Sequence, residues 1–259
     1  MFAPDAGNKA LLKYTRKGQG YPLILQHGYL GGAKMWQAQI DHFKSGYDVI
    51  APNLAGFGDS SELIAPESIP ETAQQIFDLL DSLGVERFHL LGHSMGGMVV
   101  QQMAMMQQER IEKLVCYGTG PVGVLPGRFE TLNQTRAQLK SDGLTATAKR
   151  VAATWFVEGE NAPGFPACEA EGGKATMQAA LASLTAWEKW DASDALATIS
   201  CPTLVLWGDR DQSYAWQQPQ SLWQGIPDSY LAVVPGCGHN VHMEKPALFN
   251  MIVDDFLSG

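Results

Sequence analysis

The sequence is poor in cysteine, has no run of basic residues and has no long apolar stretch. Its four cysteines form no Cys-x-x-Cys pair and no Cys/His cluster with the spacing of a zinc site. In a chain of 259 residues they do not suggest a disulfide framework, and we expect Cys116 and Cys201 to pack as small apolar residues. The sequence therefore predicts neither a bound metal nor a disulfide-stabilised fold.

Charge and hydropathy exclude further classes of protein. With 18 basic and 27 acidic residues the net charge is −9, which argues against nucleic acid or an anionic membrane as a partner. The chain has no run of about 18 apolar residues with which to span a bilayer. Residues 1–5 show neither the basic start nor the apolar core of a secretion signal. We therefore expect a cytoplasmic protein, a monomer or small homo-oligomer, whose partner is a small molecule.

What the chain does contain is an alternation of short apolar runs and helical patterns. Its composition, 45% hydrophobic and 17% charged, is typical of a globular protein with a sizeable core. The strand-like runs are residues 22–26, 47–51, 88–91, 114–117, 203–207 and 231–234. Helical patterns separate most of these runs. This order predicts an α/β fold with a mostly parallel central sheet and helices on both faces.

The alternation stops between residues 120 and 195. This stretch is helical in pattern, its loops hold glycine and proline, and it contains no convincing strand. We therefore expect residues 1–119 and 196–259 to form the core, and residues 120–195 to form a helical cap inserted between two strands.

The expected cap carries the candidates for substrate contact. Aromatic residues at helical spacing pack in a core more often than they line a pocket. If some of them line a pocket, the candidates are Trp155, Trp187 and Trp190. Three arginines could bind a substrate carboxylate, and solvated helix faces explain them equally well; these are Arg128, Arg136 and Arg150.

The most informative segment reads strand, sharp turn and helix, with a serine at the apex. Ser94 lies within Gly92-His93-Ser94-Met95-Gly96, which is the Gly-x-Ser-x-Gly pattern of a nucleophile elbow. Both glycine positions must be small because the strand and the helix pass close to each other there. The helix that follows places its N-terminus under Ser94, where it favours developing negative charge. The pattern predicts that Ser94 is a nucleophile.

A serine hydroxyl needs a neighbouring base, and the base needs a carboxylate to orient it. His239 follows the last strand-like run in a glycine-rich loop, which makes it the best candidate for the base. The loop after residues 203–207 holds two acids, Asp209 and Asp211, and we favour Asp211. The order Ser94, Asp211, His239 is the order in which α/β folds with a nucleophile elbow carry their triad.

An oxyanion hole is the third requirement of this chemistry. We expect one N–H donor from Met95, directly after the nucleophile, and the other from Tyr29 in the glycine-rich loop after the first strand-like run. His27 in the same loop is expected to brace it by hydrogen bonding.

Together these motifs resemble the α/β-hydrolase fold superfamily along essentially the whole chain. The matching segments are His27-Gly28, residues 53–60, residues 92–97, residues 208–211, Gly238-His239 and residues 244–246. In this family the catalytic acid is usually the last residue of Gly-x-x-Asp, which corresponds to Asp211. Asn53 departs from the aspartate common at its position, so the bonding of its loop stays open.

The resemblance implies a serine hydrolase of a small carboxylic ester or lactone, acting through an acyl-enzyme without metal or organic cofactor. The chain looks most like bacterial esterases, enol-lactonases and C–C bond hydrolases. Two alternatives stay open. C–C bond hydrolases use the same triad on ring-fission diketones, and a ligand receptor can keep a hydrolase fold with little turnover.

Overall fold

A seven-stranded sheet forms the centre of the protein. The computed structural model describes residues 10–259, so residues 1–5, which bear on the secretion signal, lie outside it. The strand order is β1-β3-β2-β4-β5-β6-β7, with β1 antiparallel to β3 and all other neighbours parallel. The strands are β1 (Tyr14–Lys17), β2 (Tyr21–Gln26), β3 (Tyr47–Pro52), β4 (Phe88–His93), β5 (Ile111–Tyr117), β6 (Thr203–Gly208) and β7 (Ser229–Val234). The expected α/β fold with a mostly parallel sheet is confirmed.

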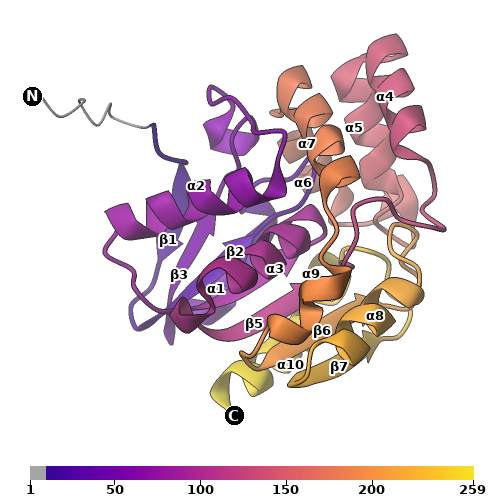
Figure 1. Ribbon diagram of the computed structural model, residues 1–259. Helices are drawn as coiled ribbons and strands as arrows, with labels where there is room; N and C mark the ends of the chain where they lie inside the picture. The colour runs from indigo at the N-terminus through magenta and orange to yellow at the C-terminus, as the bar shows by residue number, and fades with distance from the viewer. Residues whose placement is uncertain (1–9) are drawn as a thin grey trace, which may run out of the picture.

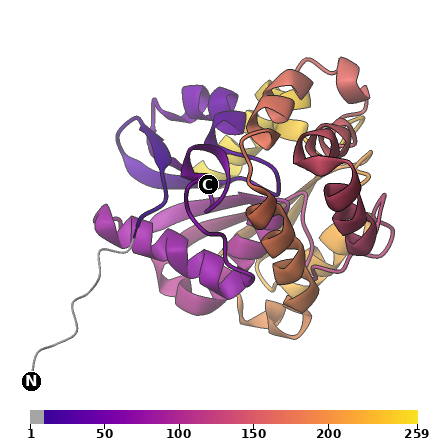
Figure 2. The same ribbon diagram turned by 90° about the horizontal axis from the view of Figure 1, so that it is seen from above.

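Helices cover both faces of this sheet (Figures 1 and 2). The helices that accompany the strands are α1 (Gln37–Phe43), α2 (Ile69–Ser82), α3 (Met95–Gln107), α8 (Gln217–Gly225), α9 (Val241–Glu244) and α10 (Pro246–Ser258). Successive strand residues point to opposite faces, so Leu90 joins the core under α2 and α3 while Leu91 joins the core under α1 and α10. Strands buried on both faces explain why their sequences are continuously apolar.

Residues 120–195 leave the sheet after β5 and return to it before β6. They hold α4 (Leu132–Ser141), α5 (Gly143–Ala153), α6 (Phe165–Gly172) and α7 (Met177–Lys189), which gather at one end of the molecule in Figure 1. The two ends of the segment meet, because Val122 and Asp191 form an isolated antiparallel bridge and the Ala192 N–H donates to the Pro121 carbonyl over 2.8 Å. Because the two ends of residues 120–195 lie side by side, β5 and β6 remain neighbours in the sheet.

The sheet has one strand more than the six runs that the sequence predicts. The edge strand β1 was not expected, because its sequence Tyr-Thr-Arg-Lys is polar and largely exposed. Helix α4 begins at Leu132, since Thr131 caps it by accepting a hydrogen bond from the Gln134 N–H while the Gln134 side chain bonds back to the Thr131 N–H.

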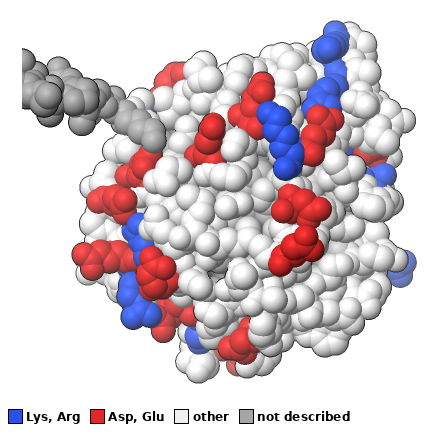
Figure 3. Space-filling view, viewed as in Figure 1, with Lys and Arg blue, Asp and Glu red and all other residues white. Residues whose placement is uncertain are grey.

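The described residues include no helix with the length and hydrophobicity needed to cross a lipid bilayer. On the face shown in Figure 3, acidic and basic side chains stand close together around a broad uncharged area. Other acidic side chains on the same face have no basic side chain beside them in Figure 3.

Candidate active site

Ser94 lies at the sharp turn between β4 and α3. Its backbone has φ 58° and ψ −120°, a strained conformation for a residue with a Cβ. A Cβ on Gly92 would lie 2.3 Å from the Gly96 carbonyl oxygen, and one on Gly96 would lie 2.5 Å from the His27 carbonyl oxygen. The two glycines of the motif are therefore required by close backbone approach. The turn holds Ser94, which is 8% exposed, above the carboxyl end of the strand.

His239 and Asp211 form a buried pair beside this turn. The imidazole Nδ1 lies 2.8 Å from Asp211 Oδ2, and each side chain is 1% exposed. The other carboxylate oxygen accepts the N–H groups of Ser213 at 2.7 Å and Tyr214 at 3.1 Å. The loop after β6 thus fixes the carboxylate, and the carboxylate fixes the tautomer and orientation of the ring.

Asp209, the competing acid, has a different role. Its Oδ1 accepts the Gly236 N–H over 2.6 Å, and its side chain is 34% exposed. It therefore ties the loop after β6 to the loop after β7. Of the two acids it is Asp211 that contacts His239.

The second nitrogen of His239 is the free end of the pair. Nε2 is buried and has no hydrogen-bond partner within residues 10–259, so the Ser94 hydroxyl does not donate to it in this structure. Tyr214 contacts the base and borders the nucleophile, because its ring stacks on His239 and it lines the same cavity as Ser94. Hydrogen bonds between a nucleophile and its base are often loose without substrate.

The main chain of His239 is held from below by residues that the sequence did not single out. The Tyr117 hydroxyl donates to the His239 carbonyl over 2.8 Å, and His93 Nε2 lies 3.1 Å from the same oxygen. His242 is 1% exposed and lies beneath the same loop. Its Nδ1 lies 3.0 Å from the Tyr117 hydroxyl, and burial lowers its pKa to about 3. The only sequence signal for this support was the number of histidines and aromatic residues near the ends of β4, β5 and β7.

The glycine-rich loop after β2 packs directly against the nucleophile. A Cβ on Gly28 would lie 2.8 Å from the Cβ of Ser94. His27 braces the loop, as its Nε2 accepts the Leu54 N–H over 3.0 Å and its Nδ1 lies 2.7 Å from the Gly28 carbonyl. Burial lowers the pKa of His27 to about 4, so the ring is neutral and acts as donor and acceptor at once.

The two residues expected to supply oxyanion donors lie in the segments that contact and follow Ser94. Tyr29 follows Gly28 in the same loop, and its side chain lines the cavity that contains Ser94. Met95 is the first residue of α3, so its N–H has no acceptor within the helix.

Asn53 links three segments near this loop. Its Oδ1 accepts the Ala33 N–H over 2.9 Å, and its Nδ2 donates to the Lys13 carbonyl over 3.4 Å. An aspartate could make the first bond and not the second, because an ionised carboxylate only accepts. The amide of Asn53 therefore holds the segments of Ala33 and Lys13 together.

A small cavity lies over Ser94. Its empty volume is about 260 Å³, of which only about 10 Å³ can hold the centre of a water molecule. The lining residues from the β2, β4 and β6 side are Tyr29, Ser94, Ser213 and Tyr214, and those from residues 120–195 are Leu125, Arg128, Val151, Trp155 and Trp187. Trp190 does not line it; its Nε1 donates to the Gln102 side chain over 3.2 Å at another place.

Three of the lining side chains carry buried polar atoms that are unsatisfied. The hydroxyls of Tyr29 and Tyr214 and the indole Nε1 of Trp187 have no hydrogen-bond partner in the described part of the chain. Buried polar atoms normally find partners. No group of three or more His, Cys, Asp or Glu side chains in residues 10–259 has the arrangement of a metal site.

Comparison with known proteins gives the family. A model of the alpha/beta hydrolase fold family matches residues 21–246. A 2-hydroxy-6-oxo-6-phenylhexa-2,4-dienoate hydrolase from Comamonas testosteroni is 29% identical, covering 95% of this chain and 91% of its own length. The chain also superposes on the structure of a thermophilic esterase from Thermogutta terrifontis, with TM-score 0.84, 25% identity and coverage of 95% of this chain and 93% of the esterase.

The structure of an enol-lactonase from Burkholderia xenovorans LB400 gives a TM-score of 0.87 at 22% identity and covers 96% of both chains. At that identity the likeness concerns the fold alone. The family match over most of the chain is sufficient for the assignment. This protein belongs to the alpha/beta hydrolase fold family and is a hydrolase.

Proposed function

We propose that this protein is a serine hydrolase that cleaves a small carboxylic ester or lactone through an acyl-enzyme. The observation that carries the proposal is the buried Asp211–His239 pair, whose free Nε2 faces no other partner in residues 10–259 and lies near the strained Ser94 turn. A neutral imidazole with Nδ1–H directed at a carboxylate has its Nε2 lone pair available as a base.

The chemistry follows from these positions. Ser94 Oγ attacks the substrate carbonyl carbon while His239 Nε2 takes the hydroxyl proton. The tetrahedral oxyanion receives hydrogen bonds from the Tyr29 and Met95 N–H groups. His239 then returns the proton to the leaving oxygen, the C–O bond breaks and the acyl group stays on Ser94. Water attacks the acyl-enzyme with His239 again as base, and the acid is released.

The size of the cavity supports a small substrate. Only about 10 Å³ of it can hold the centre of a water molecule, which is room for about one water, so a substrate enters only if the lining side chains move apart, and a small substrate requires the least movement. We also propose that residues 120–195 act as a cap, because Val151, Trp155 and Trp187 close the cavity from above. Leu125 and Arg128 line both this cavity and a second, more open hollow of about 160 Å³, which favours entry between them.

A second candidate is hydrolysis of a C–C bond in a ring-fission diketone. The observation that favours it is the relative from Comamonas testosteroni, which carries the name of a dienoate hydrolase and matches over 95% of this chain. The same three side chains serve either reaction, so substrate preference decides between them.

The test is a panel of substrates measured with wild-type protein and with Ser94→Ala. We expect turnover of p-nitrophenyl esters that is fastest with short acyl chains and falls steeply beyond about eight carbons, because the cavity over Ser94 is small and closely lined by side chains. Ser94→Ala should abolish it. Rates that rise toward palmitate would indicate a lipase, and cleavage of a ring-fission dienoate without ester turnover would establish the second candidate.

A further inference from the structure

The three arginines of residues 120–195 differ in what surrounds them. Arg136 forms a two-pronged ion pair with Glu188, with Nη2 lying 2.7 Å from Oε2. Arg150 pairs with Glu130, with Nη1 lying 2.9 Å from Oε2. These two guanidinium groups already have carboxylate partners, so the chain itself accounts for them.

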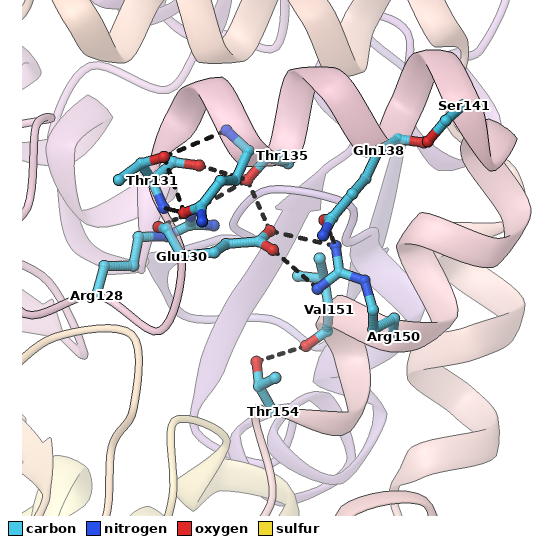
Figure 4. A network of polar contacts seen from close by, with 10 residues as sticks. Arg128, Glu130, Thr131, Thr135, Gln138, Ser141, Arg150, Val151 and Thr154 are labelled. Carbon is cyan, nitrogen blue, oxygen red and sulfur yellow. Dashed lines mark hydrogen bonds and ion pairs between the residues drawn. The ribbon is translucent and has the colours of Figure 1, made fainter.

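Arg128 is different, as Figure 4 shows. Its Nη1 donates to the Glu130 main-chain carbonyl over 2.9 Å and lies 3.2 Å from the Thr135 hydroxyl. Both acceptors are neutral, and no carboxylate within residues 10–259 forms an ion pair with it. The nearest acid, Glu130, is engaged by Arg150 and by the Thr135 hydroxyl, which donates to it over 2.7 Å. Glu130 therefore neutralises Arg150, and the positive charge of Arg128 is left without an ion-pair partner.

That positive charge is at the wall of the Ser94 cavity. Arg128 lines the cavity together with Tyr29 and Trp187. Its guanidinium carbon lies 5.4 Å from the centre of a Trp187 ring and 4.5 Å from the centre of the Phe129 ring. Aromatic faces hold a planar guanidinium in place without neutralising it. Burial lowers the pKa of Arg128, because removing the guanidinium from water disfavours its charged form.

The same cavity contains three unsatisfied buried groups, the Tyr29 and Tyr214 hydroxyls and the Trp187 indole N–H. Each can donate a hydrogen bond, and the indole N–H can do nothing else. Burial raises the pKa of both tyrosines, so both hydroxyls stay protonated at neutral pH. A ligand that suits this wall is negatively charged and rich in acceptors.

We propose that Arg128 binds a carboxylate of the substrate, so that the hydrolysed ester or lactone carries a free acid group in addition to its scissile bond. A carboxylate has two acceptor oxygens and matches the fork of a guanidinium. The Trp187 indole and the Tyr29 hydroxyl are positioned to complete its hydrogen bonds. This inference rests on the proposed hydrolase function, since it concerns the same cavity.

The experiment compares two esters of nearly equal shape, monomethyl succinate and its neutral amide, methyl succinamate. We expect wild-type kcat/KM to favour the acid by about 10- to 100-fold, the range of a charge-assisted hydrogen bond. Arg128→Gln should reduce this ratio to near one, mainly through KM for the acid, and Arg128→Lys should restore part of it. Arg136→Gln, whose partner is Glu188, should leave the wild-type ratio unchanged. Ester turnover with no preference for the acid would overturn the inference while leaving the proposed hydrolase function intact.

A binding measurement keeps the inference testable if neither ester is cleaved. Calorimetric titration with succinate and with succinamide should give binding of the acid to wild-type protein and to Arg136→Gln, and loss of that binding in Arg128→Gln. Equal binding by Arg128→Gln and wild type, or no binding of the acid at all, would show that Arg128 does not hold a carboxylate.

Discussion

The ring of Tyr214 lies nearly parallel to that of His239, with 11° between the planes and 5.5 Å between the centroids. The Tyr214 N–H also donates to Asp211, which is the carboxylate that faces His239 Nδ1. One short loop after β6 therefore supplies both the acid for the imidazole and the surface against which the imidazole packs. The orientation of His239 depends on this loop as a unit.

The first prediction concerns that stack. Tyr214→Phe keeps the ring and removes the hydroxyl, so kcat on a small ester should stay within a few-fold of wild type. Tyr214→Ala removes the ring and opens space beside His239, so kcat should fall by 10-fold or more, in line with a loosened base. Steady-state kinetics of the two variants distinguish positioning by the ring from chemistry by the hydroxyl. Equal losses in both would indicate that the hydroxyl matters.

The second prediction concerns the two acids of the loop. Asp211→Asn should lower kcat by about 10⁴-fold, because an amide cannot stabilise the imidazolium and favours the wrong tautomer. Asp209→Asn should have a mild effect, since its contact is with the Gly236 N–H in the next loop. The measurement is kcat on the best substrate of the panel. A greater loss in Asp209→Asn would contradict the assignment.

The third prediction concerns the nucleophile and its strain. Ser94→Ala should abolish labelling by a fluorophosphonate probe and cut turnover by several orders of magnitude. Ser94→Gly should be inactive as well, and more stable than Ser94→Ala by about 1 kcal/mol, because glycine adopts the φ of 58° without strain. Urea unfolding of the two variants gives the difference. Labelling of either variant at another serine would show that the nucleophile lies elsewhere.

The fourth prediction concerns Gly28. In Gly28→Ala the new methyl group would meet Ser94 Cβ at 2.8 Å and the His93 carbonyl oxygen at 2.9 Å. The loop that carries Tyr29 must then shift, and we expect kcat to fall by 10-fold or more with a smaller change in KM. Gly46→Ala is the matched control, because nothing lies within 4 Å of its new methyl group. Full activity of Gly28→Ala would show that the loop plays no part in catalysis.

The fifth prediction concerns stability in acid. Burial lowers the pKa of His27 from 6.5 to about 4 and that of His242 from 6.5 to about 3. The unfolded chain therefore binds these protons at a higher pH than the folded protein does. Their contribution to stability is complete above pH 6.5 and is lost as the pH falls toward 4 and 3, at up to about 1.4 kcal/mol per pH unit for each group.

The free energy of unfolding from urea titrations at pH 7.5, 6 and 5 tests this. We expect it to decrease steadily, and His242→Phe should show a shallower decrease than wild type whatever its stability at pH 7.5. His42→Gln is the control, since His42 is exposed on α1. Equal slopes for wild type and His242→Phe would contradict the prediction.

Much of this protein was determined by local sequence. Continuous apolar runs separated by helical patterns predicted the parallel sheet, because a strand covered on both faces must be apolar throughout. Gly92, Ser94 and Gly96 define a turn that depends on close backbone approach and little else. The position of Asp211 and His239 after successive strands predicted their common edge, and the structure brings these two side chains together.

Tertiary structure decided what depends on contacts between distant segments. The edge strand β1 is polar and is held by pairing with β3, so its own residues gave no signal. Trp187 and Trp190 lie three residues apart, and the sequence offers no reason to prefer one of them as a pocket residue. In the fold only Trp187 lines the cavity over Ser94.

The same holds for the arginines. Arg128, Arg136 and Arg150 were indistinguishable in the sequence, because the charge of a guanidinium says nothing about its partner. Folding brought Glu188 to Arg136 and Glu130 to Arg150, and it left Arg128 at the cavity over Ser94 with neutral acceptors. A cation is available to a ligand only when the rest of the fold has not neutralised it, and that is settled by long-range packing.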